Sequence, residues 1–78
     1  MAKLEKLVQR VLRRPPQMRF DEVRRLLEAL GWELHHETGS HTFFTRPGER
    51  AIAIPRTGGR SVKRAYIEQL IDRLGLDG

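Results

Sequence analysis

One histidine, His41, follows a Gly39-Ser40 pair and opens a segment rich in Thr and Phe. A histidine side chain titrates near neutral pH, so it can act as a general base or a general acid. RNA is cleaved by such groups when a base removes the 2′-hydroxyl proton and an acid protonates the leaving 5′-oxygen. His41 is therefore the candidate catalytic residue, and a surface histidine at the start of a strand is the plainer interpretation.

Two further histidines, His35 and His36, are adjacent in the preceding segment. In a strand their side chains point to opposite faces, so they cannot both face one site. Either His35 or His36 could be the second proton carrier, or one of them could be a partly buried residue of the sheet. The three histidines lack a strong zinc-ligand spacing, and no carboxylate is obviously placed to complete a set. No metal and no cofactor are expected.

Positive charge gathers around these histidines. Residues 38–65 contain six Lys and Arg against one Glu, whereas residues 66–78 contain one Arg against three acids. Local concentration of positive charge is what a polyanion such as RNA requires. The residues expected to contact RNA are Ser40, Arg46, Arg56, Gly58, Gly59, Arg60, Lys63 and Arg64.

The Gly58-Gly59 loop precedes a predicted helix. The free N–H groups at a helix N-terminus attract phosphate, and Arg60, Lys63 and Arg64 would add positive charge there. The alternative is an ordinary flexible loop followed by a Ser61 cap. The full Walker pattern is absent, so a nucleotide-hydrolysing phosphate loop is not expected.

Apolar residues at helical spacing predict three helices. The first spans residues 3–14 and ends at Pro15-Pro16, since proline disrupts the helical hydrogen bonds. The second begins after an Asp21 N-cap and stops at Gly31. The third runs from about 62 to 74, with Ser61 as its N-cap and Gly75 as its stop.

Between the second and third helices the sequence predicts three strands, 32–37, 41–46 and 50–54. Gly39 would supply the positive φ of the first hairpin loop, and Pro47-Gly48 fits a type II turn. Alternation places His36 with Trp32 and Leu34 on one face of the first strand. It also predicts that Phe43 and Phe44 point to opposite faces of the sheet, without deciding which one faces the helices.

Composition limits the remaining possibilities. A chain of 78 residues makes one small domain, with room for a shallow surface site but little for a deep cavity. It contains no cysteine, which removes disulfides and cysteine-ligated zinc and suits a cytoplasmic protein. Charged residues interrupt the N-terminal apolar residues, so neither a signal peptide nor a membrane span is expected.

Four features together resemble the HicA (YcfA-like) toxins over residues 20–76: the segment Gly39-Ser40-His41, the strand through Ile52-Ala53-Ile54-Pro55, the Gly58-Gly59 loop, and a closing helix that ends Leu74-Gly75-Leu76. The resemblance implies an α+β fold like that of the double-stranded RNA-binding domain. This fold has the order α-β-β-β-α and a three-stranded antiparallel sheet. We expect residues 1–78 to form a single domain, with a core at 20–76 and an N-terminal helical extension at 1–17.

The resemblance also implies a function. Such proteins are toxin-type endoribonucleases that cleave mRNA and are neutralised by a HicB-like antitoxin, and the histidine at this motif position is catalytic. That role is carried here to His41 alone. A second histidine often follows directly in the family, but this chain has Thr42 there, which leaves the second proton carrier open.

Two other functions remain open at this point. The chain could be a non-catalytic RNA-binding module of the same fold. It could also be an interaction protein that binds a partner through the open sheet face or the extra helix. That helix could pack on its own domain, bind a second copy to form a homo-oligomer, or extend the basic surface with Lys6, Arg10, Arg13 and Arg14.

Overall fold

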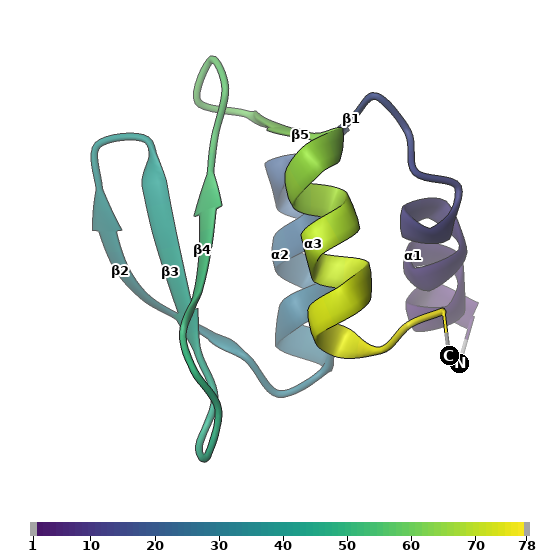
Figure 1. Cartoon of the computed structure of the whole chain (residues 1–78), viewed down its shortest axis with the longest axis horizontal. Coiled ribbons are helices and arrows are strands. Elements are labelled where there is room, and N and C mark those ends of the chain that lie inside the picture. Colours follow the sequence, from purple (N-terminus) through teal and green to yellow (C-terminus); the bar gives the residue numbers. More distant parts are fainter. Residues whose placement is uncertain (1, 78) are drawn as a thin grey trace.

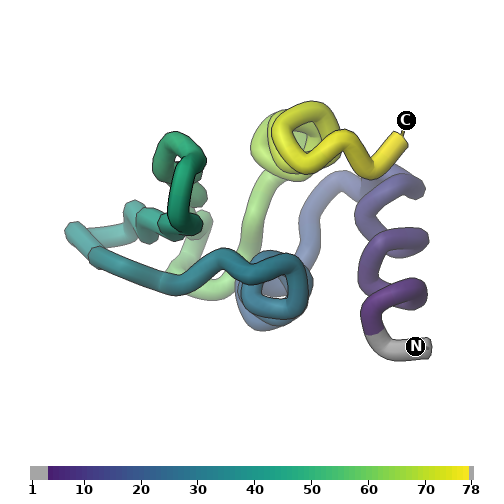
Figure 2. Tube along the Cα trace, turned by 90° about the horizontal axis from the view of Figure 1, so that it is seen from below, coloured from purple at the N-terminus to yellow at the C-terminus, as the bar shows by residue number. Residues whose placement is uncertain are grey.

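The protein is built in three layers, which Figures 1 and 2 show from two directions. A three-stranded sheet forms one outer layer, two helices form the middle layer, and the N-terminal helix forms the other outer layer. The computed structural model describes residues 2–77. Its elements are α1 (Ala2–Leu12), β1 (Gln17–Arg19), α2 (Phe20–Ala29), β2 (Glu33–Thr38), β3 (His41–Thr45), β4 (Ile52–Pro55), β5 (Ser61–Lys63) and α3 (Arg64–Leu74).

The predicted order of helices and strands is confirmed, with α1 added before an α-β-β-β-α arrangement. Helix α1 packs on α2 and α3 through its apolar stripe, in which Val11 is fully buried and Leu7 and Val8 are half-buried. The extra helix therefore extends the core of its own chain. No helix in the described range 2–77 is long and apolar enough to cross a membrane.

Two short strands were not predicted. Strands β1 and β5 pair antiparallel, with Met18 opposite Val62, and both of these side chains are buried. This pairing ties the segment before α2 to the segment before α3, at the end of the helices that is uppermost in Figure 1.

Both predicted N-caps are wrong, because the strands of the β1–β5 ribbon run directly into the helices and place the N-caps at Arg19 and Lys63. Asp21 lies inside the first turn of α2, which begins at Phe20, because β1 runs directly into the helix. Ser61 lies in β5, and α3 begins three residues later, after Lys63. The predicted Gly75 stop is confirmed by its left-handed conformation, with φ of 64°.

The main sheet has the strand order β2-β3-β4 and is antiparallel throughout. The predicted turns are present: Gly39 has φ of 59°, and Gly48 has φ of 81° in a turn where Glu49 N–H donates to the Arg46 carbonyl at 3.0 Å. Phe44 faces the helices, where it is fully buried and lies 6.2 Å from the Phe20 ring between centroids. Of the two adjacent phenylalanines, Phe44 thus belongs to the core.

An irregularity in β2 changes which of its residues share a face. Leu34 pairs with Phe44, and the next pair is His36 with Phe43, so His35 is an extra residue in β2. A β-bulge of this kind breaks strict alternation. The expectation that His36 shares a face with Leu34 is therefore wrong: Leu34 lies on the helix-facing side and His36 on the open side.

Candidate functional site

His41 opens β3 and is exposed. Its backbone partners are Thr38 on β2 and Pro55 on β4, so it lies in the central strand at the end of the sheet. Thr42 and Phe44 are fully buried toward the helices. Because side chains alternate along a strand, His41 and Phe43 belong to the opposite, open face.

His36 lies on the same open face as His41. Its ring is 5.7 Å from the Phe43 ring between centroids, and its Nε2 atom is 2.7 Å from the Thr38 hydroxyl oxygen. Thr38 is directly opposite His41, which makes His36 and His41 diagonal neighbours across β2 and β3. The structure thus places His36 beside His41 and leaves His35 exposed at the bulge.

This arrangement suits acid–base chemistry on one substrate group. Diagonal residues on an antiparallel pair lie about 7–8 Å apart, with their β-carbons somewhat closer. Long or aromatic side chains at such positions can reach each other. A phosphodiester held between the two imidazoles could contact both. Within residues 2–77, no three His, Asp or Glu side chains gather in a metal-ligand arrangement.

Thr42, the residue directly after His41, does not belong to this face. Its side chain is fully buried, and its hydroxyl donates a hydrogen bond to the Ile54 carbonyl at 2.8 Å. The hydroxyl therefore joins β3 to β4 inside the core and is not available to substrate.

Arg56 connects the end of the sheet to the helices. Its backbone N–H donates to the Ser40 carbonyl at 2.8 Å, so the two expected RNA contacts lie next to each other. Its guanidinium points to the helix side, where it lies 5.0 Å from the centroid of the Phe20 ring and donates to Glu37 at 2.8 Å. Its Nε atom is buried and has no hydrogen-bond partner within the described residues.

The loop with Gly58 and Gly59 lies at the same end of the molecule as the β2–β3 turn (Figure 1). Both glycines have positive φ, and a β-carbon at either position would meet no atom within 4 Å. The loop leads into β5 and not directly into α3, and the Arg60 carbonyl accepts a hydrogen bond from Phe20 N–H at the start of α2. The helix N-terminus nearest this loop is therefore that of α2.

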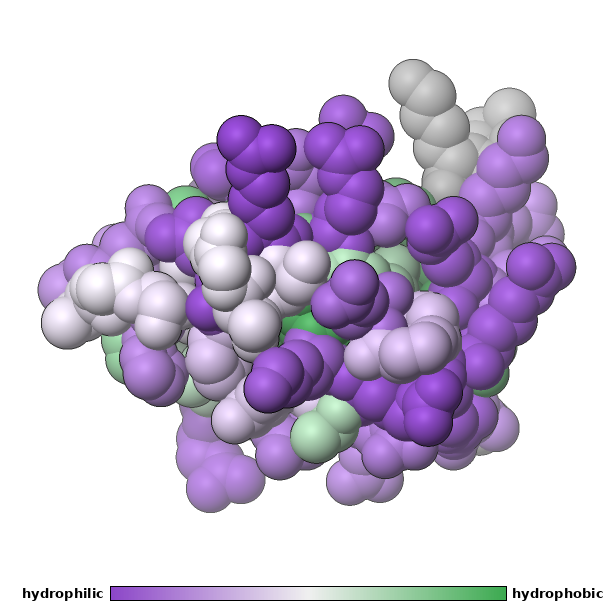
Figure 3. Space-filling view, turned by 90° about the horizontal axis from the view of Figure 1, so that it is seen from above, coloured by the Kyte–Doolittle hydropathy of each residue, from purple (hydrophilic) through white to green (hydrophobic). Residues whose placement is uncertain are grey.

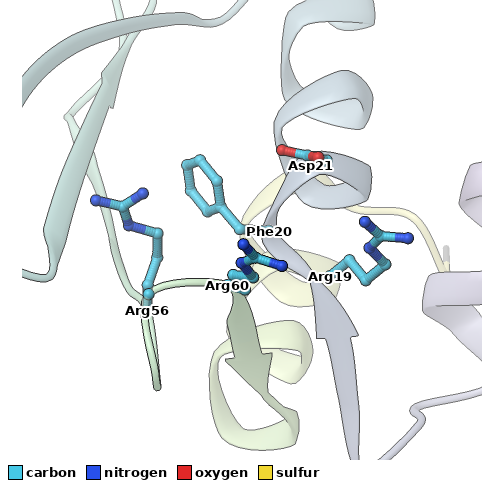
Figure 4. Close-up of a pocket in the computed structure, with 6 residues that line it drawn as sticks. Arg19, Phe20, Asp21, Arg56 and Arg60 are labelled. Carbon is cyan, nitrogen blue, oxygen red and sulfur yellow. The ribbon is translucent and has the colours of Figure 1, made fainter.

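A hollow of about 280 Å³ opens beside the loop. Its lining is Arg19, Phe20, Asp21, Arg56, Gly59 and Arg60, which Figure 4 shows. Arg19 was not among the expected contacts, because only the unpredicted β1–β5 pairing brings residue 19 beside residue 60. Seen from this end, the surface over the helical layers is strongly hydrophilic, and the end of the sheet is paler (Figure 3).

The other expected RNA contacts are spread out. Lys63 is exposed at the start of α3, and Arg64 is tied to the N-terminal segment by a hydrogen bond from its Nε atom to the Arg14 carbonyl at 2.9 Å. Arg46 lies near the β3–β4 turn, at the opposite end of the sheet from Gly58, where its guanidinium is 5.9 Å from the centroid of the Trp32 ring. The structure does not bring Arg46 together with the loop.

Comparison of the chain with known proteins identifies one matching family. Residues 20–76 match the family described as the HicA toxin of bacterial toxin–antitoxin systems. No curated protein and no solved structure matches the chain. The matched range begins at the first residue of α2 and ends just after α3, so α1 and β1 precede it. With most of its length matched, this chain belongs to the HicA toxin family.

Proposed function

We propose that this protein is an endoribonuclease that cleaves mRNA by histidine acid–base chemistry without a metal. The observation that carries the proposal is the shared open face of His36, Thr38 and His41 in a chain of the HicA toxin family. His41 is exposed at the end of the central strand, where an RNA strand could reach it.

In the proposed reaction one imidazole accepts the proton of the ribose 2′-hydroxyl. The 2′-oxygen then attacks the adjacent phosphorus, and the bond from phosphorus to the 5′-oxygen breaks. The other imidazole protonates that leaving oxygen, which gives a 2′,3′-cyclic phosphate on one product and a 5′-hydroxyl on the other. We assign His41 and His36 to these two roles, since His36 is the diagonal neighbour of His41.

Positive charge near this end of the sheet would hold the RNA backbone. Arg56 and Arg60 flank the loop beside the β2–β3 turn. Gly58 and Gly59 would allow the phosphate backbone to approach the loop closely, since no side chain covers them.

Membership of a toxin–antitoxin family implies an antitoxin partner. We propose that this partner is a HicB-like protein and that it covers the face with His41, which would block RNA. An mRNA-cleaving toxin would act in the cytoplasm.

The test is cleavage of a long single-stranded RNA by purified protein in excess chelator. We expect wild type to cleave and His41→Ala to lose roughly 10²–10⁴-fold in rate, the range typical of a proton-transfer group. His35→Ala is the matched control, because His35 is exposed at the bulge and has no cross-strand partner on β3. If His41→Ala cleaves as fast as wild type, the role assigned to His41 is wrong.

A non-catalytic RNA-binding module is the second candidate. Thr42 favours it, since the residue after His41 is turned into the core and carries no imidazole. Binding of RNA by wild type and His41→Ala alike, with no cleavage by either, would support this alternative over the nuclease.

A further inference from the structure

We propose that the hollow at the start of α2 binds one phosphodiester group of the RNA backbone, at a site separate from the reacting phosphate at His41. Its ligands would be Arg19 and Arg60, with Arg56 behind them. The inference rests on the proposed function only in its choice of RNA as the ligand, since binding does not require cleavage.

Two segments far apart in the chain build this site: the end of β1, and the loop between β4 and β5 that begins at Arg56 and ends at Arg60. Arg19 ends β1, Arg56 follows β4, and Arg60 precedes β5. Their positions are fixed by backbone pairing: Arg19 lies opposite Ser61 in the β1–β5 ribbon, and Phe20 N–H binds the Arg60 carbonyl. Figure 4 shows Arg56 on one side of the Phe20 side chain, and Arg60 and Arg19 on the other. A site held by paired backbone needs little reorganisation to bind an anion.

Among the described residues, the three arginines that line the hollow have one ion-pair partner between them. Within residues 2–77, neither Arg19 nor Arg60 has a carboxylate within ion-pair distance. Arg56 is paired with Glu37 at 2.8 Å, yet its buried Nε atom has no partner. The unpaired guanidinium groups of Arg19 and Arg60 line one hollow and repel each other, and an anion between them would relieve that repulsion.

Counting charges indicates which anion fits. Three arginines face two carboxylates, namely Asp21 in the lining and Glu37 on Arg56. Glu22, the next acid along α2, accepts the Arg19 backbone N–H at 3.4 Å, but its charge is balanced by Arg10 at 3.1 Å, so the pair leaves the count unchanged. One positive charge is left over, which matches the single negative charge of a phosphodiester. A terminal phosphate carries about −1.5 to −2 at neutral pH, which exceeds it.

The lining also favours a phosphate over a base. Phe20 is only 6% exposed and its ring is covered by Arg56, so no aromatic face is open for stacking. The hollow also lies at the N-terminus of α2, where the helix dipole favours an anion, because its lining includes the N-cap Arg19 and the first helical residue, Phe20. Contact with a phosphate would position the RNA strand without distinguishing its base sequence.

The site lies on the helix side of the sheet, and His41 lies on the open side. Arg56 and Ser40 connect the two sides, because the Arg56 backbone N–H donates a hydrogen bond to the carbonyl of Ser40, the residue before His41. An RNA strand anchored in the hollow would therefore pass over the end of the sheet to reach His41.

The test is the salt dependence of binding of a labelled 12-nucleotide oligouridylate to the His41→Ala protein, which removes cleavage from the measurement. Adding Arg19→Gln or Arg60→Gln should weaken binding roughly three- to tenfold at about 0.1 M salt. Each should lower the slope of log K against log salt by about 0.7, the value for one phosphate on a single strand. The double variant should lower the slope no further than one single variant, because both arginines serve one phosphate.

Two control variants sharpen the test. Arg50→Gln removes the same charge at the β3–β4 turn, at the opposite end of the molecule, and should leave the affinity within about twofold. Asp21→Asn removes the negative charge from the lining and should tighten binding, an effect opposite in sign to that of the arginine variants. Thermal unfolding of every variant would separate loss of the site from loss of the fold.

The outcomes distinguish this site from the proposed nuclease. If the arginine variants keep the wild-type salt slope, the phosphate site is wrong even when wild type cleaves RNA through His41. If wild type never cleaves but the arginine variants bind RNA more weakly, the site stands and the nuclease proposal fails. Tighter binding of a 5′-phosphorylated oligouridylate that depends on Arg19 would replace the phosphodiester with a terminal phosphate. Variants that weaken only antitoxin binding would assign the hollow to a protein carboxylate and overturn the proposal.

Discussion

The hydroxyl oxygen of Thr38 lies 2.7 Å from Nε2 of His36, and Thr38 is also the cross-strand partner of His41. Thr38 thus contacts one histidine of the open face along β2 and pairs with the other across the strands. A hydrogen bond to one ring nitrogen restricts both the orientation of the imidazole and the nitrogen that carries its proton. In the proposed reaction we therefore expect Thr38 to hold the His36 ring in position.

Replacing Thr38 by Ala should therefore slow RNA cleavage without unfolding the protein. We expect a loss of about 2- to 13-fold, which corresponds to about 0.5–1.5 kcal/mol for one hydrogen bond. The measurement is the single-turnover cleavage rate as a function of pH. Thr38→Ser keeps the hydroxyl and should retain most of the rate and the wild-type pH profile. A wild-type pH profile in Thr38→Ala would count against the positioning role.

Substitutions of the two adjacent histidines should have very different effects on the rate of RNA cleavage. His36→Ala should lose roughly 10²–10⁴-fold in cleavage rate if His36 is the second proton carrier, whereas His35→Ala should stay within a few-fold of wild type. Cleavage assays on both variants, beside RNA-binding measurements, separate a chemical role from one in affinity. The reverse order of effects would move the second role to His35 and contradict the placement given by the bulge.

This choice between the histidines shows where sequence reasoning ends. The motif locates His41, and strict alternation predicts that His35 and His36 lie on opposite faces, but nothing in residues 33–38 predicts the bulge that breaks this alternation. The bulge depends on how β2 registers against β3, with Leu34 opposite Phe44 and His36 opposite Phe43. Register is a property of the pair of strands, so one strand read alone gives the wrong face for His36.

The same reasoning explains the missed ribbon. The helices have long apolar stripes and the main strands are rich in β-branched and aromatic residues, so both were predictable. Strand β1 is three residues long and contributes one buried side chain, Met18, between two exposed ones. Its identity as a strand comes from pairing with β5, more than forty residues later in the chain. The hollow that contains Arg19 depends on this pairing and was therefore not predictable either.

Thr42→Val should lower stability without changing the open face. The substitution keeps the size of the side chain and removes the hydroxyl that donates to the Ile54 carbonyl at 2.8 Å. We expect a loss of about 1–2 kcal/mol in the free energy of unfolding. Chemical denaturation measures it, and Thr45→Val on the half-buried end of the same strand is the control, with an expected change below about 0.5 kcal/mol. A stable Thr42→Val protein would mean that this hydrogen bond does not hold β3 to β4.

Substitutions of the two adjacent phenylalanines should differ in how much stability they remove. Phe44→Ala removes a fully buried ring that contacts Phe20, and should cost about 3–5 kcal/mol of stability. Phe43→Ala removes a half-buried ring on the open face beside His36, so its cost in stability should be smaller. Thermal unfolding of both variants checks the order. Equal losses would contradict the assignment of Phe44 to the core and Phe43 to the open face.

The N-terminal helix gives the last prediction, because it lies outside the range that matches the family. Val11 is fully buried against the middle layer, so Val11→Ala should cost about 1–3 kcal/mol in the free energy of unfolding. Gln9→Ala, an exposed position on the same helix, is the matched control and should change stability by less than about 0.5 kcal/mol. Denaturant unfolding at several protein concentrations gives a second reading. A Val11→Ala effect that grows on dilution would place the apolar stripe against a second copy, whereas a constant effect places it against α2 and α3 of the same chain. We expect the constant effect, since α1 contacts both of those helices and its stripe is continuous with their core.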